Sequence, residues 1–130
     1  AIHDGARPLV TPEVIEEAVS AAARSGAAAP AIPVIDTIKR WEDGLGVETV
    51  ERSTLRAVQT PQVFEAGLIR AATQKALEDG ELLTDDCGAV ERLGKKVTLT
   101  QGSRENIKIT TPLDLVLGEA ILTARAEGRL

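Results

Sequence analysis

The sequence predicts an α/β domain, in which short apolar strands alternate with helices around a largely parallel sheet. Three apolar segments have the character of strands: "AIPVI" at residues 31–35, "KVTLT" at 96–100 and "NIKIT" at 106–110. Segments with helix start and stop signals lie between them. The chain of 130 residues has the length of one ordinary domain. We therefore expect a single α/β unit over residues 1–130.

Four helices are predicted from their boundary residues. Two Thr-Pro pairs place a threonine N-cap before a proline at the first helical position, at residues 11–12 and 111–112. Thr84, followed by two acidic residues, predicts the cap of a short helix that stops before Gly94. The pair Thr60-Pro61 differs, because the residues after it favour an extended chain. The predicted helices span residues 12–25, 66–78, 85–93 and 112–126.

Residues 38–59 do not fit the alternation of strands and helices. Two β-like stretches flank Asp43-Gly44-Leu45-Gly46, a sequence typical of a hairpin turn. The hairpin carries several charges and little apolar surface, and an isolated hairpin is not stable in water. We therefore expect it to project from the domain and to pack on another molecule, most simply a second copy of this chain.

Composition excludes several classes of partner. The net charge of −5 argues against general binding to nucleic acid or to an anionic membrane. Trp41 and Phe64 are the only aromatic residues, so stacking on bases is nearly excluded.

Cys87 is the single cysteine, which rules out an internal disulfide and favours a reducing compartment; we interpret it as a structural residue. With no long apolar run, the expected protein is soluble and cytoplasmic.

The stretch "HDGARP", at residues 3–8, concentrates polar groups of the kind that loops of α/β proteins offer to a ligand. Asp4 can hold a metal ion or a sugar hydroxyl, and Arg7 can pair with a phosphate. The alternative is a loop in which Asp4 and Arg7 only bridge to each other. A lone histidine such as His3 is more often a buried hydrogen-bonding residue than a ligand.

Five further residues are candidates for binding a phosphorylated ligand. Thr37 follows an apolar strand, where α/β folds place ligand groups, or it only starts the hairpin. Arg52 and Thr60 lie in a polar stretch, although an exposed hairpin arginine is usually just a solvated charge. Thr84 is a possible anion or hydroxyl site or a plain N-cap. Lys108, flanked by two isoleucines, points to solvent or meets a phosphate near the edge of the sheet. The residues alone predict an α/β protein for a small phosphorylated polar ligand.

Five stretches together resemble the 2-C-methyl-D-erythritol 4-phosphate cytidylyltransferases: "IHDGARPLV", "PVIDTIKR", "TLRAVQTPQVF", "TDDCGAVERLG" and "GSRENIKITTPLDL". The resemblance implies a Rossmann-like nucleotidyltransferase fold with three layers and a projecting arm that reaches into the partner subunit of a homodimer. It also implies a reaction that joins CTP and methylerythritol phosphate to CDP-methylerythritol and pyrophosphate, with a divalent metal, usually Mg²⁺.

The same resemblance assigns roles to individual residues. It identifies residues 38–59 as the arm, so that Arg52 meets the phosphate of methylerythritol phosphate in the other subunit's site. It implies that Asp85 holds substrate-binding residues in place without binding the substrate itself. It assigns catalysis to Arg52, Lys108 and Asp4, with Asp4 also as a metal ligand, and substrate binding in the same pocket to Arg7, Thr37, Thr60 and Thr84.

Members of this family begin with a Gly-rich, basic segment that wraps the phosphates of CTP, and this sequence contains no such segment. We therefore expect residues 1–130 to be the carboxyl-terminal part of a single nucleotidyltransferase domain, and the 130-residue chain alone to be inactive. The residues that bind CTP are left unassigned. Two alternatives remain open: a ribitol 5-phosphate cytidylyltransferase, and a non-catalytic fragment that dimerises and binds phosphate.

Overall fold

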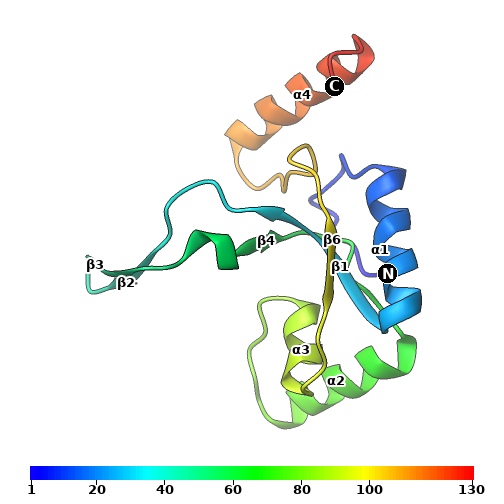
Figure 1. Ribbon diagram of the computed structural model, residues 1–130. Coiled ribbons are helices and arrows are strands. Elements are labelled where there is room, and N and C mark those ends of the chain that lie inside the picture. Colours follow the sequence, from blue (N-terminus) through cyan, green and yellow to red (C-terminus); the bar gives the residue numbers. More distant parts are fainter.

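The computed structural model describes residues 1–130 and has the α/β architecture that the sequence predicts (Figure 1). Its helices are α1 (Pro12–Ser25), α2 (Ala66–Glu78), α3 (Asp86–Arg92) and α4 (Pro112–Ala126). Its strands are β1 (Ala27–Pro33), β2 (Lys39–Glu42), β3 (Leu45–Thr49), β4 (Arg56–Val58), β5 (Val63–Phe64) and β6 (Thr98–Gln101), with a 3₁₀ turn at Arg52–Thr54. None of the helices combines the length and the hydropathy that a membrane-spanning helix needs.

The main sheet is mixed, so the expectation of largely parallel pairing was wrong. β1 lies at its centre; β6 pairs with it in parallel, with Ala29 opposite Leu99. β4 and β5 both pair with β1 in the antiparallel sense, with Ala31 opposite Val58. The reason is that the chain leaves the end of β1 into the hairpin and re-enters the sheet at that same end. A strand formed on such a return must run antiparallel.

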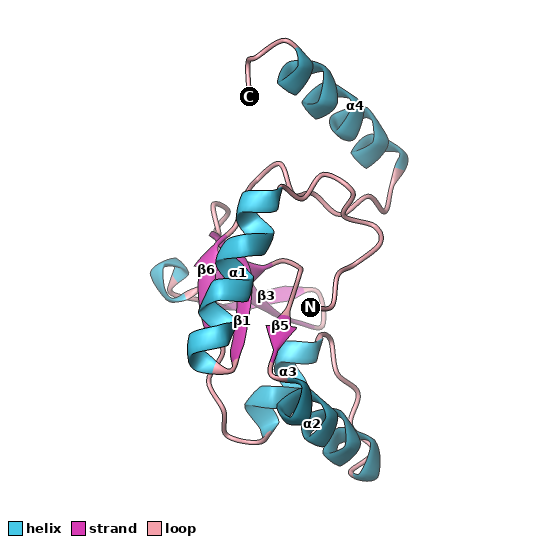
Figure 2. Cartoon of the chain, turned by 90° about the vertical axis from the view of Figure 1, so that its right-hand side faces the viewer, coloured by secondary structure: helices cyan, strands magenta, loops and turns pink.

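The central strand begins earlier than predicted, at Ala27 instead of Ala31. Ala27 and Ala28 are fully buried and point to opposite faces of the sheet. Ala28 packs with Ala18 of α1, whereas Ala27 packs with Ala72 of α2 and with residues of α3. α1 therefore covers one face of the sheet, and α2 and α3 cover the other, which gives three layers (Figure 2). Alanine has low strand propensity, but a strand buried on both faces is an apolar run without alternation.

Two other strand predictions need correction. The strand predicted at 96–100 lies at Thr98–Gln101. The segment predicted as a strand at 106–110 forms none, because its backbone is bonded to loops: the Ile109 amide donates to the carbonyl of Ala6 at 2.7 Å. Lys108 therefore lies on an irregular segment next to the "HDGARP" loop.

The helix predictions are confirmed to within two residues, with one difference in capping. Asp85, and not Thr84, caps α3, since its side chain accepts the Gly88 amide. Thr111 caps α4 and forms a reciprocal capping box with Asp114. The cap fixes where α4 starts, at one end of the molecule and apart from the sheet (Figure 1).

The predicted hairpin is shorter in the structure than residues 38–59. Its two-stranded part is formed by β2 and β3 alone, which project from the body (Figure 1). We call residues 37–52 the arm, because every residue of β2 and β3 is exposed and neither strand joins the main sheet. Residues 56–58 belong to the body, since β4 pairs with β1.

Candidate functional site

One polar cavity of about 280 Å³ brings together most of the residues predicted for the site. It lies where the "HDGARP" loop, the chain between β4 and β5, the start of α3 and the 102–110 segment meet. A hollow of about 220 Å³ adjoins it and shares several of its residues. The predicted residues that line the larger cavity are Asp4, Arg7, Thr60, Thr84 and Lys108.

The sequence of the central strand explains why polar groups gather there. Pro30 lies in the middle of β1 and has no amide hydrogen to donate to a neighbouring strand. The antiparallel neighbour of β1 is interrupted opposite this position, between β4 and β5. The Gln59 amide still donates to the Pro30 carbonyl at 2.8 Å, and the chain then leaves β1 until β5, with Gln59 and Thr60 on the wall of the cavity.

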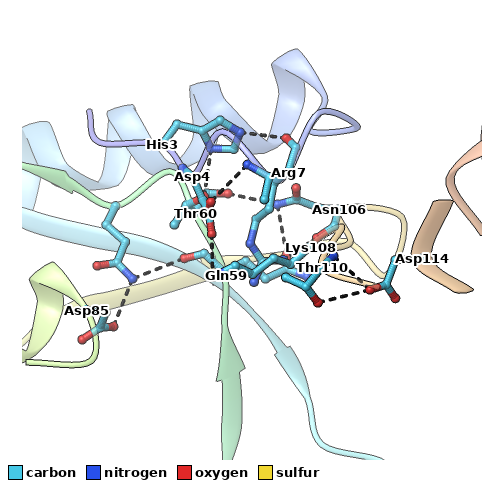
Figure 3. A network of polar contacts seen from close by, with 12 residues as sticks. His3, Asp4, Arg7, Gln59, Thr60, Asp85, Asn106, Lys108, Thr110 and Asp114 are labelled. Atoms are coloured by element: carbon cyan, nitrogen blue, oxygen red, sulfur yellow. Dashed lines mark hydrogen bonds and ion pairs between the residues drawn. The ribbon is translucent and has the colours of Figure 1, made fainter. Parts of the chain in front are cut away.

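Asp4 and Lys108 form an ion pair in this cavity, with Lys108 Nζ 3.0 Å from Asp4 Oδ2 (Figure 3). The other carboxylate oxygen accepts the Ala6 amide at 3.1 Å. The hydrogen bond from Lys108 lowers the pKa of Asp4, and the Ala6 amide lowers it further. The carboxylate is therefore charged at neutral pH. The alternative in which Asp4 and Arg7 only bridge to each other is excluded, because Asp4 pairs with Lys108.

Arg7 is partly buried and holds two loops together. Its Nη1 donates to the carbonyl of Asn106 at 2.6 Å, while its Nε is buried without a partner. Burial lowers the pKa of Arg7, and the charge of Asp4 opposes that shift. An arginine remains protonated at neutral pH even so. Arg7 therefore supplies positive charge to the cavity wall, and the pairing of its guanidinium with a phosphate stays a prediction.

His3 and Thr60 form a chain of hydrogen bonds behind Asp4. His3 Nε2 lies 2.8 Å from the carbonyl of Arg7, which can only accept, so this nitrogen carries the hydrogen. His3 Nδ1 then accepts from the hydroxyl of Thr60 at 2.9 Å. Thr60 Oγ1 accepts the Asp4 amide at 3.1 Å. The hydrogen-bonding role expected of His3 is confirmed, although the side chain is exposed and not buried.

Asp85 and Gln62 tie the start of α3 to the cavity. The Gln62 amide group donates to Asp85 Oδ2 at 3.0 Å, and its oxygen accepts the Cys87 amide at 3.0 Å. Asp85 itself lines both hollows, and the supporting role implied for it stays a prediction. Burial, with the charge of Asp85, raises the pKa of Cys87 to about 12, so the thiol is inert at neutral pH, as predicted. Thr84 lines both hollows.

Sequence reasoning missed Asn106 and gave no individual role to Gln59. Both are buried amides next to site residues. Gln59 is bonded in both directions to the backbone of Ser103, at 2.8 and 3.2 Å. A signal was available in part, because the amides inside "AVQTPQVF", next to apolar residues on both sides, need partners when they are buried.

Thr37 and Arg52 lie outside this cavity. They line a separate hollow of about 250 Å³ on the arm, together with residues 49–51. Arg52 is exposed and donates to the carbonyl of Ile35. The sequence analysis expected Thr37 in the same pocket as Thr60, Thr84 and Lys108. Within one chain, the structure does not bring Thr37 into that pocket.

The residues of this chain do not form a metal site by themselves. No group of three or more Asp, Glu, His or Cys side chains is arranged to hold a metal ion. Both oxygens of Asp4, the carboxylate predicted as a weak metal ligand, are engaged by Lys108 and by the Ala6 amide. Mg²⁺ in nucleotide enzymes takes one or two carboxylates together with substrate phosphates. No step of the chemistry is therefore assigned to a metal here.

Replacing Gly102 by alanine should destabilise the protein by about 1–3 kcal/mol, because the added Cβ has no room. It would lie 2.7 Å from Gln59 Oε1 and 3.0 Å from the carbonyl carbon and oxygen of Ala31, and backbone cannot yield. Gly5 is the matched control: no atom lies within 4 Å of an added Cβ there, so Gly5→Ala should change stability by less than about 0.5 kcal/mol. Urea unfolding of both variants measures the difference. Equal stabilities would contradict this packing at Gly102.

Known proteins of one family match nearly the whole chain. A family model described as IspD, 2-C-methyl-D-erythritol 4-phosphate cytidylyltransferase, matches residues 1–124. The enzyme of that name from Caldanaerobacter subterraneus subsp. tengcongensis is 58% identical over 123 residues, which are 94% of this chain and 54% of that protein. The Bacillus thuringiensis enzyme is 51% identical over 121 residues, 93% of this chain and 54% of that protein.

A solved structure matches as well. The crystal structure of 2-C-methyl-D-erythritol 4-phosphate cytidylyltransferase from Thermus thermophilus superposes with a TM-score of 0.85 at 42% identity, covering 93% of this chain and 60% of that one. The chain spans about half the length of the curated relatives it matches. Nearly the whole chain matches one family in sequence and in fold. The chain belongs to the 2-C-methyl-D-erythritol 4-phosphate cytidylyltransferase family.

Proposed function

We propose that this chain provides the site for methylerythritol phosphate in a cytidylyltransferase, which joins that substrate to CTP and releases pyrophosphate. The observation that carries the proposal is the cavity in which Asp4, Arg7 and Lys108 converge with two threonine hydroxyls. Cations for a phosphate and hydroxyls for a polyol are the groups that such a substrate needs. The family to which the chain belongs supports the same reaction.

In this reaction, an oxygen of the methylerythritol phosphate attacks the α-phosphorus of CTP, and the bond from that phosphorus to the β-phosphate oxygen breaks. Two anions must approach each other in line, so positioning and cationic charge can supply most of the catalysis without a covalent nucleophile. Lys108 would supply a point charge beside the attacking phosphate. Asp4 holds the lysine in place with an ion pair of 3.0 Å in the free protein.

The threonines would orient the polyol. The hydroxyl of Thr60 donates to His3 and accepts from the Asp4 amide, so one lone pair of its oxygen stays free to accept a substrate hydroxyl. Thr84 offers a second hydroxyl on the same wall.

We further propose that two copies of the chain share each site. Arg52 and Thr37 lie together on the arm, away from the other site residues. The arm also exposes Trp41 to 71% and Leu45 to 68%, which is unusual for large apolar side chains unless another molecule covers them. If the arm of one copy reaches the cavity of the other, Arg52 adds a bidentate fork for the phosphate next to Lys108.

The proposal includes the setting that the family resemblance implies. The reaction takes place in the cytoplasm and uses Mg²⁺ as its divalent metal. No residue of this chain is assigned to that ion, because Asp4 has both carboxylate oxygens engaged.

Pyrophosphate release tests the function. It should be measured on the 130-residue chain, and on an extended chain in which these residues replace the matching residues of the Caldanaerobacter relative. With CTP, Mg²⁺ and methylerythritol phosphate, we expect turnover by the extended chain and none by the 130 residues alone. Ribitol 5-phosphate is the control substrate and should be a poor one. Equal or better turnover of ribitol 5-phosphate would contradict the proposed substrate, and an inactive extended chain would contradict the proposed reaction.

A further inference from the structure

Asn106 connects the segments that carry the candidate site. Its side chain is buried, with 1% of the residue exposed, and its Nδ2 donates to the carbonyl of Thr60 at 3.0 Å. The backbone carbonyl of Asn106 accepts Arg7 Nη1 at 2.6 Å. Figure 3 shows Asn106 in the middle of the polar network, between Arg7, Thr60 and Lys108. One residue therefore touches both the chain between β4 and β5 and the "HDGARP" loop.

The contact with Thr60 lies where the chain leaves the sheet between β4 and β5. The strand that runs along β1 is interrupted between β4 and β5, where Pro30 has no amide hydrogen to offer. The carbonyl of Thr60 lies in this interruption, accepts no backbone amide and is satisfied by the side-chain amide of Asn106. The same amide lies 3.4 Å from Gln59 Oε1. The orientation of Thr60 at the cavity thus depends on a side chain from another part of the sequence.

The contacts of Asn106 also hold the segment that carries Lys108. This segment has no regular secondary structure, so it depends on bonds to its surroundings. The "HDGARP" loop grips it on both sides of Lys108, through Arg7 Nη1 at the Asn106 carbonyl and through the Ile109 amide at the Ala6 carbonyl, 2.7 Å away. The lysine between these two points reaches Asp4 at 3.0 Å.

From these contacts we infer that Asn106 is a positioning residue, whose side chain ties the segment of Lys108 to Thr60 and so keeps the Thr60 hydroxyl and the Lys108 ammonium on the same wall of the cavity. The inference rests on the proposed function of that cavity. Asn106 does not line the cavity itself. It acts through Thr60 and Lys108, and its loss should weaken the use of methylerythritol phosphate while the binding of CTP, which we assign to no residue of this chain, is unaffected.

The variant Asn106→Asp tests the inference in the extended chain. Aspartate has nearly the same shape, but a carboxylate accepts hydrogen bonds and does not donate, so the Thr60 carbonyl loses its donor. We expect kcat/KM for methylerythritol phosphate to fall on the order of 10- to 100-fold, with KM for CTP unchanged. Damage to folding alone would instead lower the amount of active enzyme and leave both KM values as they were.

Ser25→Ala is the matched control. The Ser25 hydroxyl lies 2.9 Å from the carbonyls of both Ala21 and Ala27 and donates its one hydrogen between them, so its removal also takes a side-chain hydrogen bond from a partly buried carbonyl, at a residue that does not line the cavity. It should leave KM for methylerythritol phosphate unchanged. If Asn106→Asp does not fold by circular dichroism, Asn106→Ser, which keeps a shorter donor, should show the same selective loss.

The outcomes distinguish a failure of the positioning role from a failure of the proposed function. An active wild-type extended chain whose Asn106 variants keep their kcat/KM for methylerythritol phosphate overturns the positioning role alone. A wild-type extended chain without turnover overturns the proposed function, and the positioning role falls with it.

Discussion

Replacing Arg52 by alanine in the extended chain should lower kcat/KM for methylerythritol phosphate by about 10- to 100-fold, since a charge-assisted contact to a phosphate contributes about 1.5–3 kcal/mol. Arg52 is the one cation on the wall of the arm hollow, where it lies with Thr37. In the free protein it donates only to the carbonyl of Ile35, so its fork is not engaged by a carboxylate. Steady-state pyrophosphate release measures the effect.

Arg40→Ala is the matched control for Arg52, because Arg40 is also an exposed arginine of the arm. It pairs with Glu48 across β2 and β3 at 3.1 Å, with both side chains more than half exposed. Such surface pairs contribute little, so this variant should keep its activity. Arg52→Lys retains the charge without the planar guanidinium, so its kcat/KM should lie between those of the alanine variant and the wild type. If Arg52→Ala is as active as Arg40→Ala, Arg52 does not meet the substrate.

Replacing Lys108 by methionine should have the larger effect and should reduce kcat on the order of 100-fold, as losses of a single charge-stabilising group at a reacting oxygen do. Methionine keeps an unbranched side chain of similar length and removes the charge. The ion pair with Asp4 is partly exposed, with 52% of the lysine and 26% of the aspartate side chain accessible. Its contribution to folding is therefore small, and the loss should appear in kcat and not in stability.

Lys75→Met controls for the loss of a surface ion pair. Lys75 pairs with Asp79 on α2 at 3.1 Å and its side chain is 56% exposed, much like Lys108, but it lies away from the cavity. We expect full activity from Lys75→Met and a melting temperature for both variants close to that of the wild type. An unchanged kcat for Lys108→Met would show that the lysine only supports Asp4.

The parts of the fold that the sequence could predict are those with local signals. Helix ends are set by caps and prolines, which is why α4 was predicted from Pro112 to Ala126 as it is observed. β1 could not be predicted in full, because alanines become strand residues only when two helix layers bury them. The segment 106–110 has a strand-like pattern, yet tertiary hydrogen bonds to the "HDGARP" loop decide its conformation.

The candidate site, like the fold, has a part that the sequence could predict and a part that it could not. Asp4, Arg7 and Lys108 could be proposed from residue type and motif, and the cavity that brings them together depends on the break opposite Pro30 in the sheet. Asn106 could not be singled out as a site residue from the sequence. Its partner is the Thr60 carbonyl, 46 positions earlier, and no local pattern shows that this carbonyl needs a donor. Equally, no pattern in one chain reveals whether Arg52 serves its own cavity or that of a second copy.

Mixed dimers test most directly the central claim that the arm of one copy completes the cavity of the other. Arg52→Ala and Lys108→Met subunits of the extended chain, each strongly impaired on its own, are coexpressed in equal amounts with different tags. In a shared site, each mixed dimer has one cavity with an intact Lys108 and an intact Arg52 from the partner, so activity should return to about a quarter of the wild type, and the doubly tagged dimer to about half. Dimers that form but recover no activity would show that both residues serve the same chain, and would contradict the shared site.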